Sequence, residues 1–94
     1  MKYLSTFSQS LVQAVDYYTA IDKKLALRFF ESVEHARREI IRFPKIGKLA
    51  NGYRSLLLKN FPYKFCYREN MEGELVGVVL FHPKQRESPA TMKR

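Results

Sequence analysis

The strongest constraint on the fold is a short stretch, YKFCYR at residues 63–68, in which every second side chain is an aromatic ring. Successive side chains of a β-strand point to opposite faces of the sheet, so the three rings share one face. Lys64, Cys66 and Arg68 share the other. Because aromatic rings bury large areas, the ring face is expected to form the floor of a core, which leaves Lys64 and Arg68 on an open face.

A first helix precedes this strand. Apolar side chains recur at helical spacing between Gln9 and about Ile21, which predicts an amphipathic helix. The preceding segment KYLSTF, residues 2–7, is expected to form a short first strand. Ser8 then stands where a helix N-cap is needed, and Asp22 marks the break before the next helix.

A second, longer helix follows the break. Its apolar stripe repeats at alternating steps of three and four and consists of Ala26, Phe29, Val33, Ala36, Ile40 and Phe43. Pro44 ends it, because proline has no N–H and disfavours helical geometry in the residue before it. The stripe is too short for a coiled coil, so an antiparallel helical hairpin covering a sheet is expected. Glu34 and Arg38 are expected to form a solvated i, i+4 pair on its surface.

The residue pattern after Pro44 is typical of β-strands joined by turns. KIGKLANG, residues 45–52, predicts a loop or an irregular edge, and three strand-like runs follow: YRSLLLKN, YKFCYRE and ELVGVVLFH. Turn-forming residues at 60–62 and 70–73 separate these runs, and strands joined by short turns pair antiparallel. The last run, residues 75–81, is apolar at nearly every position, as a central strand would be.

These elements predict one α+β domain over residues 1–94. Its order is strand, helix, helix and three strands, with a small antiparallel sheet packed against the N-terminal helical hairpin. The modest length allows one core, and nothing in the sequence indicates a second domain.

The charge balance favours acidic partners. Lysine and arginine outnumber aspartate and glutamate by 17 to 9, a formal net charge of +8. The single cysteine and the two histidines do not lie at metal-ligand spacing, so no disulfide, metal or cofactor is expected. No apolar run is long enough for a signal peptide or a membrane span, which favours the cytoplasm and no membrane partner.

Several side chains could extend the basic face. Arg54 and Lys59 differ by five positions, so at most one of them shares the open face with Lys64 unless a bulge intervenes. His82, Lys84 and Arg86 follow the last strand and could complete a basic concavity. His82 could serve as a general base, although one histidine at a strand end is more often structural.

Cys66 is expected to be a small hydrophobe in its strand rather than a nucleophile. A catalytic thiol needs an activating base, and nothing in the sequence places one beside it. The sequence also contains no glycine-rich phosphate loop, serine elbow or paired carboxylates.

The order of these motifs resembles the RelE/ParE superfamily of bacterial type II toxins, nearly from end to end. The resemblance rests on Tyr17-Tyr18, ALRFF at residues 26–30, Pro44 and Gly47, Gly52-x-Arg54, FPYKFCYR at residues 61–68 and FHPKQRESP at residues 81–89. It implies the same fold that the residue patterns predict, a small sheet against an N-terminal helical hairpin.

The resemblance implies one of two activities. RelE-like toxins are ribosome-dependent endoribonucleases that cut messenger RNA, whereas ParE-like toxins, known as plasmid stabilisation toxins, inhibit DNA gyrase without chemistry of their own. Cleavage needs an acid, a base and phosphate-stabilising cations at one point, while gyrase inhibition needs only a complementary surface. Both kinds of toxin are neutralised by a cognate antitoxin whose acidic, disordered segment wraps the toxin.

Carried over by position, Lys59 lies near the RelE lysine region, Lys64 matches its strand arginine and Arg86 its C-terminal arginine. The RelE tyrosine after Arg86 is absent, and the expected lysine pair is reduced to Lys59. The FPY turn and the F-H-x-K-type ending resemble the ParE-like branch instead. The sequence departs from that branch as well, because its usual tryptophan is missing and one extra residue separates His82 from Arg86.

The sequence therefore favours a ParE-like gyrase inhibitor held in check by an acidic antitoxin. The surface expected to bind the target or the antitoxin consists of Arg54, Lys64, Arg68, His82, Lys84 and Arg86. The alternative is a RelE-like endoribonuclease acting on messenger RNA at the ribosome, with Lys59, Lys64, Arg68, His82 and Arg86 as its catalytic candidates. A further alternative is a non-toxic binding module.

Overall fold

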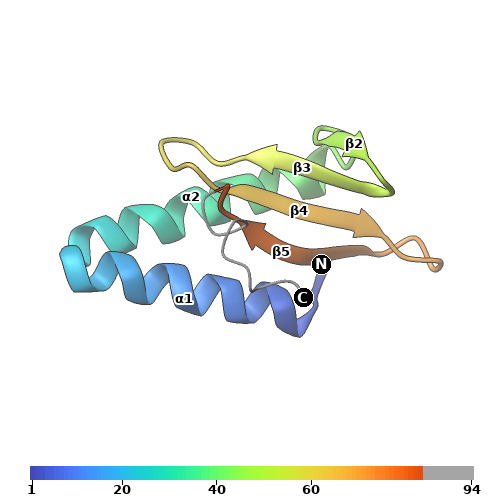
Figure 1. The fold of residues 1–94 in the computed structure, drawn as a ribbon. Coiled ribbons are helices and arrows are strands. Elements are labelled where there is room, and N and C mark those ends of the chain that lie inside the picture. Colours follow the sequence, from blue (N-terminus) through green and yellow to red (C-terminus); the bar gives the residue numbers. More distant parts are fainter. Residues whose placement is uncertain (84–94) are drawn as a thin grey trace.

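The computed structural model describes residues 1–83 as two layers, a five-stranded sheet with two helices packed on one face (Figure 1). The elements in chain order are β1 (Lys2–Tyr3), α1 (Ser5–Ile21), α2 (Lys23–Arg42), β2 (Lys48–Ala50), β3 (Tyr53–Leu57), β4 (Lys64–Glu69) and β5 (Leu75–Phe81). The α+β class, the helical hairpin and the three strands after it are as predicted.

The sheet has the strand order β1-β5-β4-β3-β2. Strands β2 to β5 pair antiparallel through short turns, as expected, and β5 lies inside the sheet. The prediction of a purely antiparallel sheet is wrong at one edge, because β1 pairs parallel with β5 through Lys2↔Val76 and Tyr3↔Gly77. Turn lengths govern only strands that are neighbours in the chain, and the helical hairpin and three strands separate this pair.

The start of α1 also differs from the prediction. Strand β1 is only two residues long, and α1 begins at Ser5, so Ser8 lies inside the helix and not at its N-cap. The reason is tertiary: Thr6 Oγ1 donates to the carbonyl of Val78 at 2.6 Å, and Ser10 Oγ accepts from the backbone N–H of Leu80 at 2.9 Å. The two hydroxyls therefore satisfy backbone groups of β5 beyond the residues that pair with β1.

The two breaks around α2 are as predicted. The Asp22 carboxylate accepts from the backbone N–H of Lys24 at 2.9 Å and caps the helix, which ends at Arg42, before Pro44. The expected Glu34–Arg38 pair is wrong, because Glu34 pairs instead with Arg37 at 2.9 Å. Arg37 and Glu34 lie on the half-buried flank of α2, whereas Arg38 points to solvent.

An irregular edge was expected after Pro44, and it contains the short edge strand β2. Asn51 and Gly52 join β2 to β3 with positive φ angles of 53° and 83°. Two consecutive residues of this kind match the twist of a tight hairpin, in which asparagine and glycine are favoured.

The core lies between the helices and the ring face of β4. Tyr63 and the two rings of the strand, Phe65 and Tyr67, are at most 3% exposed, which confirms the predicted floor. Above them pack Phe7 of α1, at 4.8 Å from the ring of Phe65, and Phe29 of α2, at 5.1 Å from the ring of Tyr63. The face of β4 that carries Lys64 is therefore turned away from the helices.

Candidate interaction surface

The open face is the side of the sheet opposite the helices. Cross-strand partners project to the same side. Its members therefore follow from the register and are Lys2, Lys48, Ala50, Tyr53, Ser55, Leu57, Lys64, Cys66, Arg68, Val76, Val79 and Phe81. Lys64 and Arg68 lie on it, as the alternation predicted. Tyr53 and Leu57 are 45% and 63% exposed, so the cations border apolar side chains and do not form a purely charged field.

Arg54 lies on the other side of the sheet. It is paired with Tyr67 across β3 and β4, and its guanidinium donates to the carbonyl oxygen of Gly47 at 2.9 Å. The Tyr67 hydroxyl donates to the carbonyl of Pro44 at 2.8 Å and accepts from the N–H of Gly47 at 2.9 Å. Arg54 thus helps to hold the segment between α2 and β2, and it lines a pocket there together with Lys45 and Arg68.

His82 also lies on the helix side, at the end of β5. Its ring stacks edge to face on Tyr63, with centroids 4.9 Å apart, and Tyr63 belongs to the core. Burial, followed by the nearby Tyr18 and Tyr17, raises the pKa of Tyr63 to about 12, so this phenol stays protonated at neutral pH. The imidazole and the Lys64 ammonium are therefore on opposite faces of the sheet.

Lys59 belongs to the loop between β3 and β4 and lies beside α2. Its backbone carbonyl accepts a hydrogen bond from Ser32 Oγ at 2.8 Å, and its side chain borders a groove along that helix. Lys84 and Arg86 lie outside the described residues. Of the predicted site residues within 1–83, only Lys64 and Arg68 lie on the open face, while Arg54 and Arg68 both line the pocket next to Pro44 and Lys45.

The environment of Cys66 agrees with a packing role. Burial raises the pKa of its thiol, against a smaller opposing effect of the Lys64 ammonium, so the nucleophilic thiolate is disfavoured. No group of His, Cys, Asp and Glu side chains within residues 1–83 could hold a metal ion. In the same part of the chain, neither helix has the length and apolar character to cross a bilayer.

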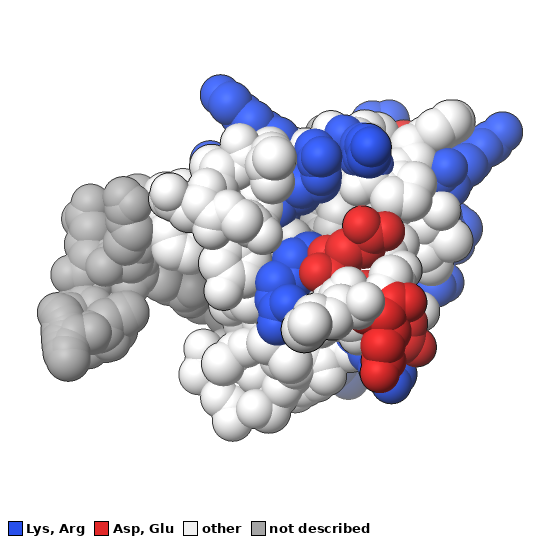
Figure 2. Space-filling view, turned by 90° about the vertical axis from the view of Figure 1, so that its right-hand side faces the viewer, with Lys and Arg blue, Asp and Glu red and all other residues white. Residues whose placement is uncertain are grey.

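Acidic residues divide the basic surface near the β4–β5 turn. Glu69, Glu72 and Glu74 come from this turn and its flanks, and Figure 2 shows acids gathered among lysines and arginines on the end of the molecule that it views. Glu74 accepts from Asn70 at 3.2 Å and pairs with Lys2 at 3.2 Å, and these contacts hold its carboxyl pKa below the usual value. Arg68 is next to this acidic turn, and Lys64 is at the far end of β4.

Two apolar features of the surface were not anticipated from the sequence. One is the pair Tyr53 and Leu57 on the open face. The other is a shallow apolar groove between the outer sides of α1 and α2, lined by Val15, Thr19, Lys23, Ala26, Leu27 and Phe30. Leu27 is 64% exposed although it lies in a strongly periodic helix. Its exposure could have been predicted from the sequence, because Leu27 lies outside the apolar stripe that contains Ala26 and Phe29. An apolar residue outside the buried stripe of a helix faces solvent or a partner.

Comparison with known proteins supports the fold. No protein-family model matches the sequence, and no curated protein matches it significantly. Among solved structures, a chain of the "Chromosomal ParDE TA system from P. aeruginosa" superposes with a TM-score of 0.73 at 16% sequence identity. The match covers 86% of this chain and 91% of that one. The protein therefore has the ParE-like α+β fold that its sequence motifs implied.

Proposed function

We propose that this protein is the toxin of a type II toxin–antitoxin system, that it inhibits DNA gyrase by binding, and that an acidic antitoxin neutralises it. The fold shared with a chain of a chromosomal ParDE system supports this assignment. The ParE-like motifs of the sequence, the FPY turn and the F-H-x-K-type ending, support it independently of the fold.

The observation that favours binding over chemistry is the dispersal of the candidate catalytic residues. Lys64 and Arg68 are on the open face, His82 stacks on the core residue Tyr63, and Lys59 borders α2. General acid–base cleavage needs such groups within hydrogen-bond reach of one reacting centre. The described residues lack that convergence, whereas a binding surface does not need it.

The open face has the composition of a docking surface. Three of its cations, Lys48, Lys64 and Arg68, come from the same strands as Tyr53 and Leu57 or from the strands next to them, so it offers charge for steering and apolar area for affinity. The net charge of +8 favours an acidic antitoxin segment, because folding on binding to a complementary charge gives fast association.

Two assays on the purified protein test the proposal. We expect it to block supercoiling by gyrase and to leave messenger RNA intact on ribosomes. Ribosome-dependent cleavage without gyrase inhibition would instead establish the RelE-like endoribonuclease. Inactivity in both assays, for a protein that is folded, would favour the non-toxic binding module.

A double variant locates the surface. Lys64→Ala with Arg68→Ala should weaken gyrase inhibition by about ten-fold, because each exposed charge contributes up to about 1 kcal/mol. The matched control is Lys24→Ala with Arg38→Ala, which removes two exposed cations from α2. Equal losses in both double variants would contradict an open-face site, since net charge alone would then explain the effect.

A further inference from the structure

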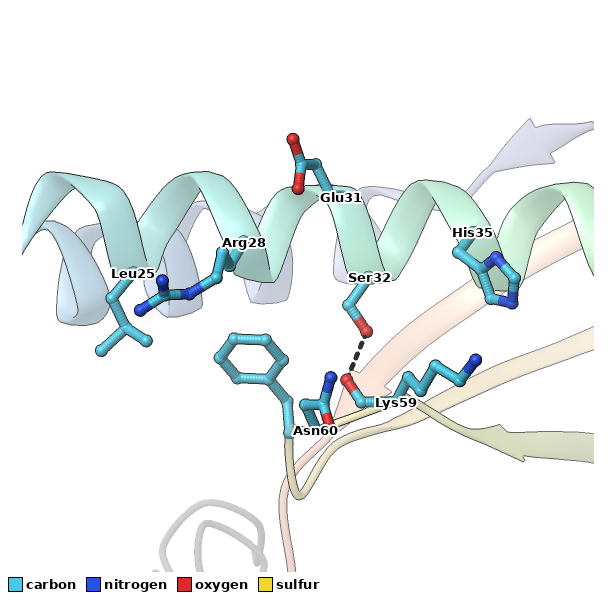
Figure 3. Close-up of a pocket in the computed structure, with 8 residues that line it drawn as sticks. Leu25, Arg28, Glu31, Ser32, His35, Lys59 and Asn60 are labelled. Atoms are coloured by element: carbon cyan, nitrogen blue, oxygen red, sulfur yellow. Dashed lines mark hydrogen bonds between the residues drawn. The ribbon is translucent and has the colours of Figure 1, made fainter.

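A groove of about 460 Å³ runs between α2 and the loop that joins β3 to β4 (Figure 3). It is on the helix side of the molecule, apart from the open face, and the proposed inhibition of gyrase does not use it. Pockets of about 300–1,000 Å³ hold small organic molecules in other proteins. The residues that line the groove are Leu25, Arg28, Glu31, Ser32 and His35 on α2, and Lys59, Asn60 and Phe61 on the loop.

The two walls of the groove are fixed to each other by contacts within the chain. The Ser32 hydroxyl donates to the backbone carbonyl of Lys59 at 2.8 Å. The Phe61 ring packs with its centroid 5.2 Å from those of Tyr18 and Phe29. The groove is therefore formed before a ligand binds, and a preformed site avoids much of the entropic cost of binding.

One end of the groove is apolar and aromatic. Because Phe61 packs on Phe29, its ring lies beside the N-terminal half of α2. Leu25 and Arg28 line the groove at the same end, and Figure 3 shows the two side chains near each other. Leu25 and Phe61 are half-buried, so part of their apolar surface is open to the groove. This end suits a planar aromatic group, because such groups stack on phenyl rings and on the guanidinium plane of arginine.

The other end of the groove is polar and positively charged. Figure 3 shows the Lys59 ammonium pointing toward this end, near the exposed ring of His35. Within residues 1–83, neither Lys59 nor Arg28 takes part in an ion pair, and the Glu31 carboxylate points away from the loop. An ammonium group and an imidazole N–H both donate to phosphate oxygens, so this end suits a phosphate.

Hydrogen-bonding groups lie between the two ends. Ser32 and Asn60 occupy the middle of the groove (Figure 3). The Ser32 oxygen can accept a further hydrogen bond, and the Asn60 amide can both donate and accept. These groups suit a sugar hydroxyl. From Arg28 to His35 the helix rises by about 10 Å, at about 1.5 Å per residue, so the two ends are close enough for one small ligand to reach both.

We propose that this groove binds a nucleoside monophosphate. The base stacks on Phe61 beside Arg28, the ribose hydroxyls bond to the Ser32 oxygen and the amide of Asn60, and the phosphate pairs with Lys59. The net charge of +8 attracts such an anion. A longer RNA or DNA strand is disfavoured, because it needs a continuous row of cations and several stacking rings, whereas the groove offers one phenyl ring. The inference is independent of what the open face binds.

The test is an NMR titration of the intact chain with adenosine 5′-monophosphate, alongside adenosine and ribose 5-phosphate. We expect amide shifts centred on Arg28, Ser32 and Asn60 that saturate at millimolar adenosine 5′-monophosphate. Adenosine lacks the phosphate and ribose 5-phosphate lacks the base, so each fills one end only and should bind about ten-fold more weakly or worse. Raising the salt from about 0.1 M to about 1 M should weaken the monophosphate and leave adenosine nearly unaffected, since only charges are screened.

Matched substitutions separate the groove from general attraction to a basic protein. Phe61→Leu and Lys59→Gln should each weaken adenosine 5′-monophosphate about five-fold or more, through lost stacking and lost charge. The controls Phe30→Leu and Lys23→Gln make the same changes in the groove between α1 and α2 and should have less than about a two-fold effect. Thermal melts verify that each variant is folded, and Lys59→Gln decides the matter if Phe61→Leu is not.

Four results would overturn the inference. The first is a set of shifts centred on the open face, and the second is an equal loss of affinity in Lys59→Gln and Lys23→Gln. The third is binding of inorganic phosphate or ribose 5-phosphate as tight as that of the nucleotide, which would reduce the groove to a general anion site. The fourth is a short RNA oligonucleotide that fills the groove at lower concentration than the nucleotide. None of these results bears on gyrase inhibition, so the two proposals fail separately.

Discussion

The hydroxyl of Tyr67 should be worth more to stability than that of any exposed tyrosine, and Tyr67→Phe tests this. The hydroxyl lies between the carbonyl of Pro44 and the N–H of Gly47, at 2.8 and 2.9 Å. Tyr67 is 1% exposed and Gly47 is also buried. Water therefore cannot readily replace the lost group, and the segment between α2 and β2 loses its attachment to the sheet.

The magnitude follows from the two bonds. An unsatisfied buried N–H costs about 1–3 kcal/mol, and a lost hydrogen bond to the Pro44 carbonyl adds about 0.5–1.5 kcal/mol. We therefore expect Tyr67→Phe to lower the free energy of unfolding by about 2–3 kcal/mol. For a domain of this size that loss lowers the Tm by roughly 10 °C or more.

Urea unfolding followed by circular dichroism measures the loss directly, with an unchanged m-value expected. The control is Tyr53→Phe, which removes a hydroxyl from a ring that is 45% exposed on β3 and should change stability by less than about 0.5 kcal/mol. A loss below about 0.5 kcal/mol in Tyr67→Phe would refute the reasoning, because the Gly47 N–H would then have found another partner.

Two further predictions concern the same core. A Cβ added at Gly47 would lie 2.8 Å from Tyr67 Oη and 2.9 Å from its Cε1. Gly47→Ala should therefore cost about 1–3 kcal/mol in urea unfolding, and its cost combined with Tyr67→Phe should be less than the sum. Additive costs would argue against this contact. Burial, with a smaller contribution from Tyr18 and Tyr17, raises the pKa of Tyr63 to about 12, from 10.0 for a free tyrosine. Keeping the Tyr63 phenol protonated contributes to the free energy of unfolding. This contribution is fully present below pH 10 and is lost as the pH rises toward about 12. Phenolate absorbance should show a tyrosine that titrates late, and simultaneous titration of all six tyrosines near pH 10 would contradict it.

Much of the fold could be predicted because it depends on interactions that are local in the chain. Alternation in YKFCYR determined which side of β4 is buried, and Pro44 ended α2 where expected. The hairpins followed from their turns. Lys64 and Arg68 were correctly placed on the open face for the same reason, since pleat geometry acts within a single strand.

The candidate site could be predicted only in part. Arg54 and His82 were expected on the basic surface, but register places Arg54 beside Tyr67, and His82 stacks on Tyr63. Their positions depend on which residues face them across the sheet. The sequence of one strand carries no information about its partner's register.

By itself, the sequence determined the identity and order of the main elements and the side of β4 that meets the core. Periodicity, proline and turn residues act over a few positions, so a single chain reveals them. Tertiary structure alone decided that β1 joins β5 in parallel, that Thr6 and Ser10 bond to backbone groups of β5, and that α2 and the β3–β4 loop form a groove. Each of these contacts joins segments far apart in the chain, and only the packing of the whole core brings them together.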